Sequence, residues 1–392
     1  MKREQIKTPL EKRPRKLRFD PPLTDSATER NYQQIFALLD RDQVSDVAAL
    51  MVDGSVSVLD VSQFVVQGDK RINHNAVRSL KKAQEFDISL SDAMWALSRL
   101  CHDEDTELKY DVMSAIAKAA EKGDDVTHVI SKMRESLGVE SVEIQSFAAT
   151  ILLHAADGIH EITKVTMALS DAIRNPNPEV YGDGIEGFAK ILVNPDYQGL
   201  AFDEFSRLRL DFRPEVRCRA MHALKKAIEV GYRGFSFHTL LSFEDEDEKV
   251  QAKTSEALGA MIVRDPDNAD IIARYHPYAA LALAFERDAK LLHKVNALKY
   301  AAEHGTDISP AVPMLLTVLS LRKNYLSTPA TTALLAASQN GYKTAVVRGI
   351  SEVLQSELFI ERAWANSQEY MDSVVEFGRL LQYMRQIPEA AA

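Results

Sequence analysis

Apolar residues recur along this chain with the spacing of one helix face, and the pattern repeats every 36 residues. One column of equivalent positions contains Ile72, Leu108, Ile144, Val180 and Val216. The positions four, eight and eleven residues further on are also apolar or small in each of these copies. Such spacings place all four columns on one stripe of a helix. The pattern therefore predicts an apolar helix that returns with the same period.

A second apolar column precedes the first in each repeat, at Val61, Leu97, Met133, Leu169 and Phe205. Turn residues separate the two predicted helices, as in Asn175-Pro-Asn-Pro178, because proline and asparagine favour a helix start. Less regular copies follow at Val250, Leu291 and Leu326. A single helical hairpin cannot bury its apolar face, so neighbouring hairpins must stack. The sequence thus predicts an all-α protein, a right-handed α-solenoid of about eight hairpins.

The ends of the repeat pattern divide the chain into four predicted parts. Residues 1–25 form a basic, flexible N-terminal arm, and residues 26–66 form an N-terminal cap with the first helices. Residues 67–340 form the repeat solenoid, and residues 341–392 form a helical C-terminal cap.

The turn and second helix of several repeats resemble HEAT repeats. The resemblance is carried by Arg213-Pro-Glu-Val-Arg-Cys-Arg-Ala-Met-His-Ala-Leu224 and by Asn177-Pro-Glu-Val180, and it extends over roughly residues 55 to 340. The period of 36 is shorter than the roughly 40 or more residues typical of that family. Similarity to the HEAT/armadillo-like α-solenoids implies a scaffold, an adaptor, a transport receptor or, less often, an enzyme.

Composition indicates a globular protein, with 46% hydrophobic and 27% charged residues among 392. No apolar run approaches the roughly 20 residues of a membrane span, and no secretory signal is recognisable at the N-terminus. We therefore expect a cytoplasmic or otherwise intracellular protein. The two cysteines, Cys101 and Cys218, cannot form a disulfide framework, and they fit a reducing compartment as small core residues.

Charge is distributed unevenly between the N-terminal arm and the rest of the chain. The net charge is -10, yet residues 1–20 contain eight basic and three acidic residues. One hypothesis makes this arm a docking tail for nucleic acid, an acidic membrane or an acidic protein. The other makes it a solubilising terminus that folds back on the acidic body. The docking residues would be Arg3, Lys7, Arg13, Arg15, Lys16 and Arg18.

One column of the second helices is basic: Lys82, Lys118, His154, Lys190 and Lys226. Stacked helices would turn it into an inner ladder that binds an acidic peptide or phosphates. Acidic residues stand three positions later in four of the five repeats, at Glu85, Glu121, Asp157 and Glu229. Pairs at that spacing form ordinary surface ion pairs. We favour this solvated face over a ladder that binds phosphates or an acidic peptide, and nucleic-acid contact would normally leave the basic face uncompensated.

Motifs of catalysis or cofactor binding are not found. Gly182-Asp-Gly184-Ile-Glu-Gly187 spells a dinucleotide fingerprint, but it lies in phase inside a predicted helix, where glycine permits close packing. The ten histidines and two cysteines show no zinc-ligand spacing. We therefore predict no catalytic residue, no cofactor and no metal.

The pattern as a whole favours a non-enzymatic scaffold or adaptor with a protein partner on its inner surface. The alternative is a nucleic-acid-binding solenoid, with or without the activity of the DNA alkylpurine glycosylases that share HEAT-like architecture.

Overall fold

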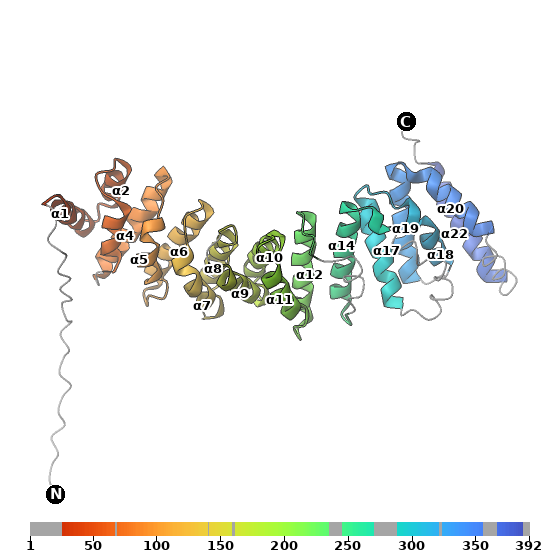
Figure 1. Ribbon diagram of the computed structural model, residues 1–392, viewed down its shortest axis with the longest axis horizontal. Coiled ribbons are helices and arrows are strands. Elements are labelled where there is room, and N and C mark those ends of the chain that lie inside the picture. The colour runs from red at the N-terminus through yellow and green to blue at the C-terminus, as the bar shows by residue number, and fades with distance from the viewer. Residues whose placement is uncertain are drawn as a thin grey trace, which may run out of the picture. The chain divides into compact units, whose positions relative to one another are not determined.

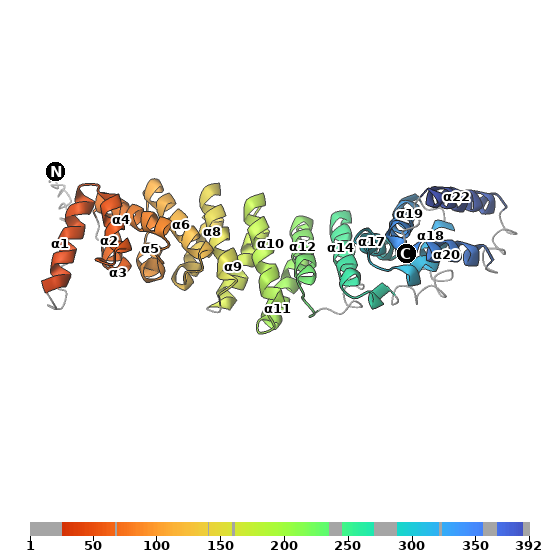
Figure 2. The same cartoon turned by 90° about the horizontal axis from the view of Figure 1, so that it is seen from above.

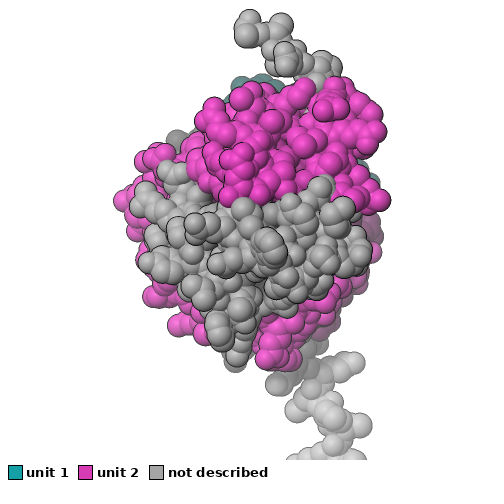
Figure 3. Space-filling model, turned by 90° about the vertical axis from the view of Figure 1, so that its right-hand side faces the viewer, with its two compact units in different colours: residues 1–97 teal, residues 98–392 magenta. Residues whose placement is uncertain are grey.

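The structure is a computed structural model that describes residues 26–66, 69–139, 141–158, 161–234, 245–269, 288–320, 324–355 and 367–386. The chain forms two compact units, Met1–Leu97 and Ser98–Ala392 (Figure 3). Every regular element in the described ranges is helical, which confirms the all-α prediction. The predicted arm, with Arg3, Lys7, Arg13, Arg15, Lys16 and Arg18, lies outside the described residues. The predicted division into four parts stays a prediction.

The first unit contains the helices that precede the regular repeats. Its α-helices are α1 (Ser26–Asp40), α2 (Val44–Val52), α3 (Val58–Ser62), α4 (Lys70–Ala83) and α5 (Met94–Ser98), the last of which ends one residue beyond the unit. Short 3-10 helices cover Gln63–Val66, Gln84–Phe86 and Ser91–Ala93. Helix α4 packs against α1, α2 and α3.

The second unit begins with regular hairpins. Its first helices are α6 (Thr106–Glu121), α7 (Ile130–Val139), α8 (Val142–Ala155), α9 (Ile162–Arg174), α10 (Pro178–Val193), α11 (Gln198–Arg209), α12 (Pro214–Glu229) and α14 (Glu248–Arg264), with a 3-10 turn at Thr127–Val129. Within hairpins, α7 packs on α8, α9 on α10 and α11 on α12. Between hairpins, α6, α8, α10, α12 and α14 each pack on the next (Figures 1 and 2).

The row of second helices continues through α17 (Asp288–Glu303) and α19 (Asn324–Ala337). Helices α18 (Val312–Ser320), α20 (Lys343–Gln355) and α22 (Ser367–Arg385) pack around α19, with a 3-10 turn at Ser309–Ala311. A π-turn at Ser338–Tyr342 separates α19 from α20, where Gly341 takes a φ of 95°. Counting α4, the described residues contain eight second helices, the number that the repeat predicts.

The predicted columns form the core of both units. The second-helix column of Ile72, Leu108, Ile144, Val180 and Val216 is at most 3% exposed. The first-helix column of Val61, Leu97, Met133, Leu169 and Phe205 is fully buried. Apolar burial of this kind contributes roughly 1.5–3 kcal/mol for each large side chain. The residues that recur every 36 positions are therefore residues of the packed core.

Helix starts repeat with the same period. The residues that precede the second helices are Asp69, Asp105, Ser141, Asn177 and Arg213, each 36 residues after the last. The first four accept hydrogen bonds from backbone N–H groups of the first turn, whereas the Arg213 side chain accepts none. A glutamate column lies in the same first turns, at Glu107, Glu143, Glu179 and Glu215, where acidic side chains stabilise the helix dipole.

The two cysteines differ in their surroundings. Cys101 is fully buried, and burial raises the pKa of its thiol to about 12. Cys218 is only half-buried, so the prediction of a core position is wrong for this residue, whose Sγ lies 3.8 Å from the carbonyl oxygen of Lys249 on α14. In the described ranges, no helix combines the length and the hydropathy that crossing a membrane requires.

Candidate interaction surface

On five second helices of the second unit, α6, α8, α10, α12 and α14, one stripe is half-buried instead of buried. Positions three and seven residues apart lie on one stripe of a helix, so these residues line up along each helix axis. We call the following set the second-helix surface: Asp111, Ser114 and Lys118 on α6; Phe147, Thr150 and His154 on α8; Asp183, Glu186 and Lys190 on α10; Arg219, His222 and Lys226 on α12; Lys253 and Glu256 on α14. Because these five helices pack one on the next, their stripes are neighbours.

The structure places four of the five predicted ladder residues on this surface. Lys118, His154, Lys190 and Lys226 occupy equivalent positions on α6, α8, α10 and α12. Lys82 lies at the corresponding position of α4, in the first unit.

Some of the ladder lysines form ion pairs with other partners than the spacing along one helix predicts. Lys82 pairs with Glu85 on its own helix, as expected, with an Nζ to Oε2 distance of 2.5 Å. Lys190 instead reaches back to Asp157 of the preceding repeat, with 2.7 Å between Nζ and Oδ2. Lys226 likewise pairs with Glu186 on α10. The expected pairing of Lys226 with Glu229 is therefore wrong, because a lysine side chain can span the gap between adjacent second helices.

The two remaining ladder positions form no ion pair with any described residue. Lys118 and His154 stay unpaired with Glu121 and Asp157, the partners that the single-helix spacing predicts. Asp157 is engaged by Lys190 instead. On this surface the unpaired positions are therefore neighbours on α6 and α8, and the paired lysines follow on α10 and α12.

Hydrogen bonds join α8 to α10 across the same surface. The Ser146 hydroxyl donates to Oε2 of Glu179 at 2.8 Å, and the Thr150 hydroxyl donates to Oδ2 of Asp183 at 2.7 Å. Burial raises the pKa of Asp183, and the neighbouring carboxylates of Glu179 and Glu186 act in the same direction. The α10 segment of the surface is therefore acidic and hydrogen-bonded.

The next segment, on α12, α14 and α17, is basic and equally connected. Lys225 Nζ lies 3.2 Å from Oε2 of Glu256, which also accepts from Lys253 at 2.8 Å. Lys225 stands 5.0 Å from the ring centre of Tyr300, whose hydroxyl donates to Glu229 at 2.8 Å. These side-chain contacts connect α12 to α14 and to α17.

His222 lies among these lysines on α12. Burial lowers the pKa of its imidazole, and the positive charges of Lys253, Lys226 and Lys225 lower it further. A lowered pKa keeps the ring neutral at pH 7, where it offers one donor and one acceptor to a ligand.

An aromatic pair joins α6 to α8, with Phe147 in the second-helix surface and Tyr110 beside it. Tyr110 is 46% exposed, and its ring meets the ring of Phe147 edge to face, with 5.1 Å between centroids. Exposed aromatic side chains in fixed positions are typical anchors of protein interfaces. The surface therefore combines charges of both signs, neutral polar groups and an aromatic pair.

The glycine motif on α10 permits close helix packing, as its position inside the predicted helix indicates. A Cβ atom at Gly184 would lie 2.9 Å from the backbone N of Ile173. A Cβ atom at Gly187 would lie 2.8 Å from the side chain of Leu169. Both glycines thus allow α10 to approach α9 closely. The motif lies within the helix Pro178–Val193 and has no strand before it, unlike a dinucleotide site.

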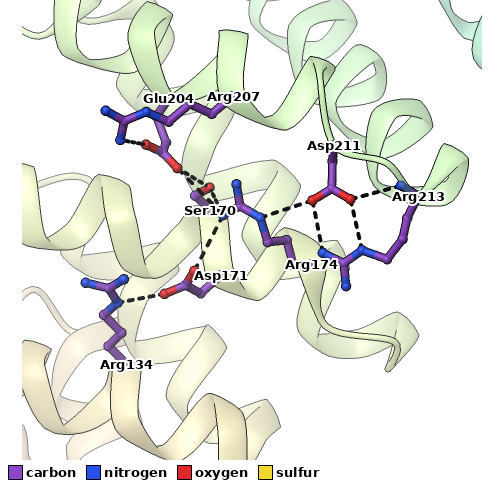
Figure 4. A network of polar contacts seen from close by, with 8 residues as sticks. All are labelled: Arg134, Ser170, Asp171, Arg174, Glu204, Arg207, Asp211 and Arg213. Carbon is purple, nitrogen blue, oxygen red and sulfur yellow. Dashed lines mark hydrogen bonds and ion pairs between the residues drawn. The ribbon is translucent and has the colours of Figure 1, made fainter.

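Sequence reasoning missed a second set of contacts, which connects the first helices α7, α9 and α11 (Figure 4). Arg134 Nε lies 2.6 Å from Oδ2 of Asp171, and Arg174 Nε lies 3.4 Å from Oδ2 of Asp211. The first of these pairs joins α7 to α9, and the second joins α9 to the turn after α11. An arginine followed by an aspartate 37 residues later is the signal that could have revealed them.

The network extends through Ser170 to the next helix. The Ser170 hydroxyl donates to Oε1 of Glu204 at 2.7 Å, and Arg174 donates to the Ser170 oxygen at 2.6 Å. Arg207 Nη1 lies 2.9 Å from Oε2 of Glu204, and Arg213 Nε lies 2.9 Å from Oδ1 of Asp211 (Figure 4). Charge-assisted contacts therefore run through three consecutive repeats.

Comparison with known proteins gives matches at the level of structure. No family model matches the chain, and no curated protein matches its sequence. A mutant of Kap121p superposes with a TM-score of 0.52 at 11% identity, over 93% of this chain and 43% of that one. The karyopherin Kap121p bound to the extreme C-terminus of the protein phosphatase Cdc14p gives 0.51 at 13% identity, over 92% and 44%.

The chain thus spans less than half the length of these karyopherins. A designed armadillo repeat protein matches over 52% of this chain and all of its own, at 19% identity and a TM-score of 0.35. The buried 36-residue columns, the stacked second helices and the karyopherin likeness show that the chain has the fold of a HEAT/armadillo-like α-solenoid.

Proposed function

We propose that this protein is a non-enzymatic scaffold or adaptor that binds a protein partner along its second-helix surface. The observation that carries the proposal is the composition of that surface on five consecutive second helices. An acidic segment on α10 adjoins a basic segment on α12 and α14, and the Tyr110–Phe147 pair lies on α6 and α8. A protein partner can satisfy charges of both signs and an aromatic anchor together.

Preorganisation supports this function. The hydroxyls of Ser146 and Thr150 hold Glu179 and Asp183 in place, and Glu256 is held by two lysines. Side chains that are already ordered lose less conformational entropy on binding. Complementary charges then contribute chiefly to orientation and specificity, while the aromatic pair contributes buried apolar area.

The structural neighbours are consistent with a protein ligand. Kap121p was solved with the extreme C-terminus of a protein phosphatase bound to it, and it shares the solenoid fold with this chain. In our proposal the basic N-terminal arm of residues 1–25 adds a second contact to the same partner. Two linked contacts raise the apparent affinity through effective concentration.

Nucleic acid is the competing ligand, and the geometry of the ladder disfavours it. Lys190 and Lys226 are paired with the carboxylates of Asp157 and Glu186, and α10 adds Asp183 to the same surface. Phosphate binding would require these ion pairs to break and would bring phosphates close to carboxylates. A glycosylase site would need an uncompensated basic face, which the described second helices do not form.

Site-specific photo-crosslinking tests the proposed surface directly. A benzophenone amino acid replaces Tyr110 in the full chain, and in a control protein it replaces Lys132 on α7, whose side chain is 42% exposed. We expect position 110 to crosslink a protein in native lysate and position 132 to give no matching product. Crosslinks only from position 132 would contradict the proposal.

Salt dependence separates the two ligand classes. The full chain is compared with a variant for binding to a single-stranded oligonucleotide and to a duplex. The variant lacks residues 2–18 and carries four substitutions: Lys82→Ala, Lys118→Ala, Lys190→Ala and Lys226→Ala. A nucleic-acid-binding protein would show a steep loss of affinity with salt that these changes flatten. We expect weak binding with little salt dependence in both proteins.

A further inference from the structure

Two large apolar side chains are strongly exposed in the turn between α11 and α12. Leu210 is 71% exposed and Phe212 is 86% exposed, the two highest values for large apolar residues in the described part of the chain. The equivalent positions of the preceding hairpin are Arg174 and Pro176. This turn therefore carries two large apolar side chains at positions where the preceding turn has Arg174 and Pro176.

The backbone of this turn is firmly held. Asp211, between the two apolar residues, accepts from the backbone N–H of Arg213 at 3.0 Å and from its guanidinium at 2.9 and 3.0 Å. Arg217 donates from Nη1 to the carbonyl oxygens of Asp211 and Phe212, at 3.0 and 3.2 Å. Arg217 is itself fixed by two hydrogen bonds to Asp245 at 2.7 and 2.8 Å. Leu210 and Phe212 are thus presented on a rigid support.

The basic side chains around the turn are more exposed than the acidic side chains with which they pair. The carboxylates of Glu204 and Asp211 are each 9% exposed, whereas the side chains of their partners Arg207 and Arg213 are 69% and 38% exposed. The Arg213 guanidinium carbon lies 5.3 Å from the centre of the Phe212 ring. An approaching molecule therefore meets guanidinium N–H donors beside two apolar side chains, although the chain as a whole has a net charge of -10.

We propose that the turn Leu210–Arg213, together with Arg207, is a docking surface for a protein segment that carries carboxylates beside large apolar side chains. Exposed guanidiniums bind carboxylates with directional, often bidentate hydrogen bonds. Phe212 and Leu210 supply the apolar contact that a purely ionic ligand would leave in water. Rigid support by Arg217 reduces the entropy that binding would otherwise cost.

This docking surface goes beyond the proposed function, because it lies at the end of the hairpin, outside the second-helix surface. A nucleic acid could engage Arg207 and Arg213 but offers no aliphatic partner for Leu210. A lipid surface would require a larger apolar area than two side chains provide. The combination of groups on this turn fits an acidic and apolar peptide segment best.

A random-peptide library displayed on phage supplies the probe for a test with the full chain. We expect selected peptides to contain Asp or Glu close to large apolar residues. Their affinity should fall at least tenfold for a double variant with Leu210→Ser and Phe212→Ser, and at least threefold for Arg207→Glu. The matched control is Val230→Ser at the other end of α12, where Val230 is 68% exposed, and its affinity should be unchanged.

Folding is checked in each variant by circular dichroism and the thermal midpoint. The midpoint should stay unchanged for the Leu210 and Phe212 variants because both side chains are exposed, whereas Arg207→Glu loses the ion pair with Glu204 and should unfold at a lower temperature. A milder variant, Phe212→Ala, is measured alongside and should lose affinity in the same direction. Selection of basic peptides, or of acidic and apolar peptides that bind all variants equally well, would overturn the proposal. Failure to enrich any peptide that is sensitive to Phe212→Ala would overturn it as well.

Discussion

At the scale of single residues, the turns before the second helices depend on a column of Asp and Asn side chains. Asp103, Asn175, Asp211 and Asp245 each accept a hydrogen bond from the backbone N–H two residues later, at 2.9 to 3.0 Å. Such turns satisfy backbone donors that the helix leaves unpaired. Asp211 matters most among them, because the Arg213 side chain that follows provides no cap of its own.

The variant Asp211→Asn should destabilise the protein in a pH-dependent manner. The hydrogen bond from Arg213 lowers the pKa of Asp211 from 3.8 to about 2 in the folded protein. A lowered folded-state pKa adds stability that is present at neutral pH and lost as the pH falls from about 4 to about 2. We expect the free energy of unfolding to fall by about 2 kcal/mol at pH 7.

Urea denaturation at a series of pH values between 7 and 3 measures this difference. The gap between wild type and Asp211→Asn should narrow toward low pH. Asp203→Asn, an exposed position on α11, serves as the control and should stay within about 0.5 kcal/mol of wild type throughout. A gap that stays constant with pH would exclude the charge of Asp211 as the cause.

At the scale of one element, helix α10 contains two nearby glycines with different surroundings, Gly182 and Gly184. A Cβ atom at Gly182 would meet nothing within 4 Å, whereas at Gly184 it would lie 2.9 Å from the backbone N of Ile173 and 3.0 Å from Cβ of Ala172. Helix α10 contacts α8, α9, α11 and α12, so little room exists for a shift of the whole helix.

Alanine substitutions at Gly182 and Gly184 should have opposite effects on stability. Gly182→Ala should raise the free energy of unfolding by roughly 0.5–1 kcal/mol, since alanine favours a helix interior. Gly184→Ala gains the same helix propensity but forces α10 away from α9, and we expect a net loss of about 1–3 kcal/mol. Chemical denaturation of both variants is the measurement, and a stabilising Gly184→Ala would show that α9 and α10 can separate freely.

At the scale of the whole molecule, each repeat of the second unit depends mainly on its sequence neighbours. Helix α8 packs on α6, α7, α9 and α10, and α14 packs on α12 and α17. Side-chain contacts follow the same rule, as in the step of 37 residues from Arg134 to Asp171. Such proteins behave approximately as a series of units with nearest-neighbour interfaces.

Removal of one full repeat should therefore leave the remaining repeats folded. Deletion of residues 142–177 removes α8 and α9 and joins Ser141 to Pro178, which preserves a capping residue before a helix that begins with proline. We expect circular dichroism to show the helical content per residue of the full chain, with unfolding at a lower urea concentration.

A deletion of half that length, residues 142–159, is the matched control. It removes α8 but keeps α9, so a first helix would occupy the place of a second helix. We expect loss of helical content well beyond the deleted residues. Equal behaviour of the two deletions would contradict the nearest-neighbour description.

Much of the fold and part of the candidate surface could be predicted from periodicity. The apolar columns, the turn at Asn175-Pro-Asn-Pro178 and the interior position of Gly184 all follow from local spacing, because each helix must bury one stripe and start at a turn. The ladder residues Lys118 to Lys226 were placed correctly on their helices for the same reason. Their partners were not, since Lys226 reaches Glu186 on the neighbouring second helix.

The sequence by itself determined the helical hairpin, its period and the residues of the core, because these depend on contacts within a hairpin and on burial alone. Tertiary structure decided which charged groups pair across layers, as Lys190 does with Asp157, and which turn exposes Leu210 and Phe212. Those outcomes depend on side-chain distances between helices that are adjacent only after folding, and a one-dimensional pattern contains no measure of such distances.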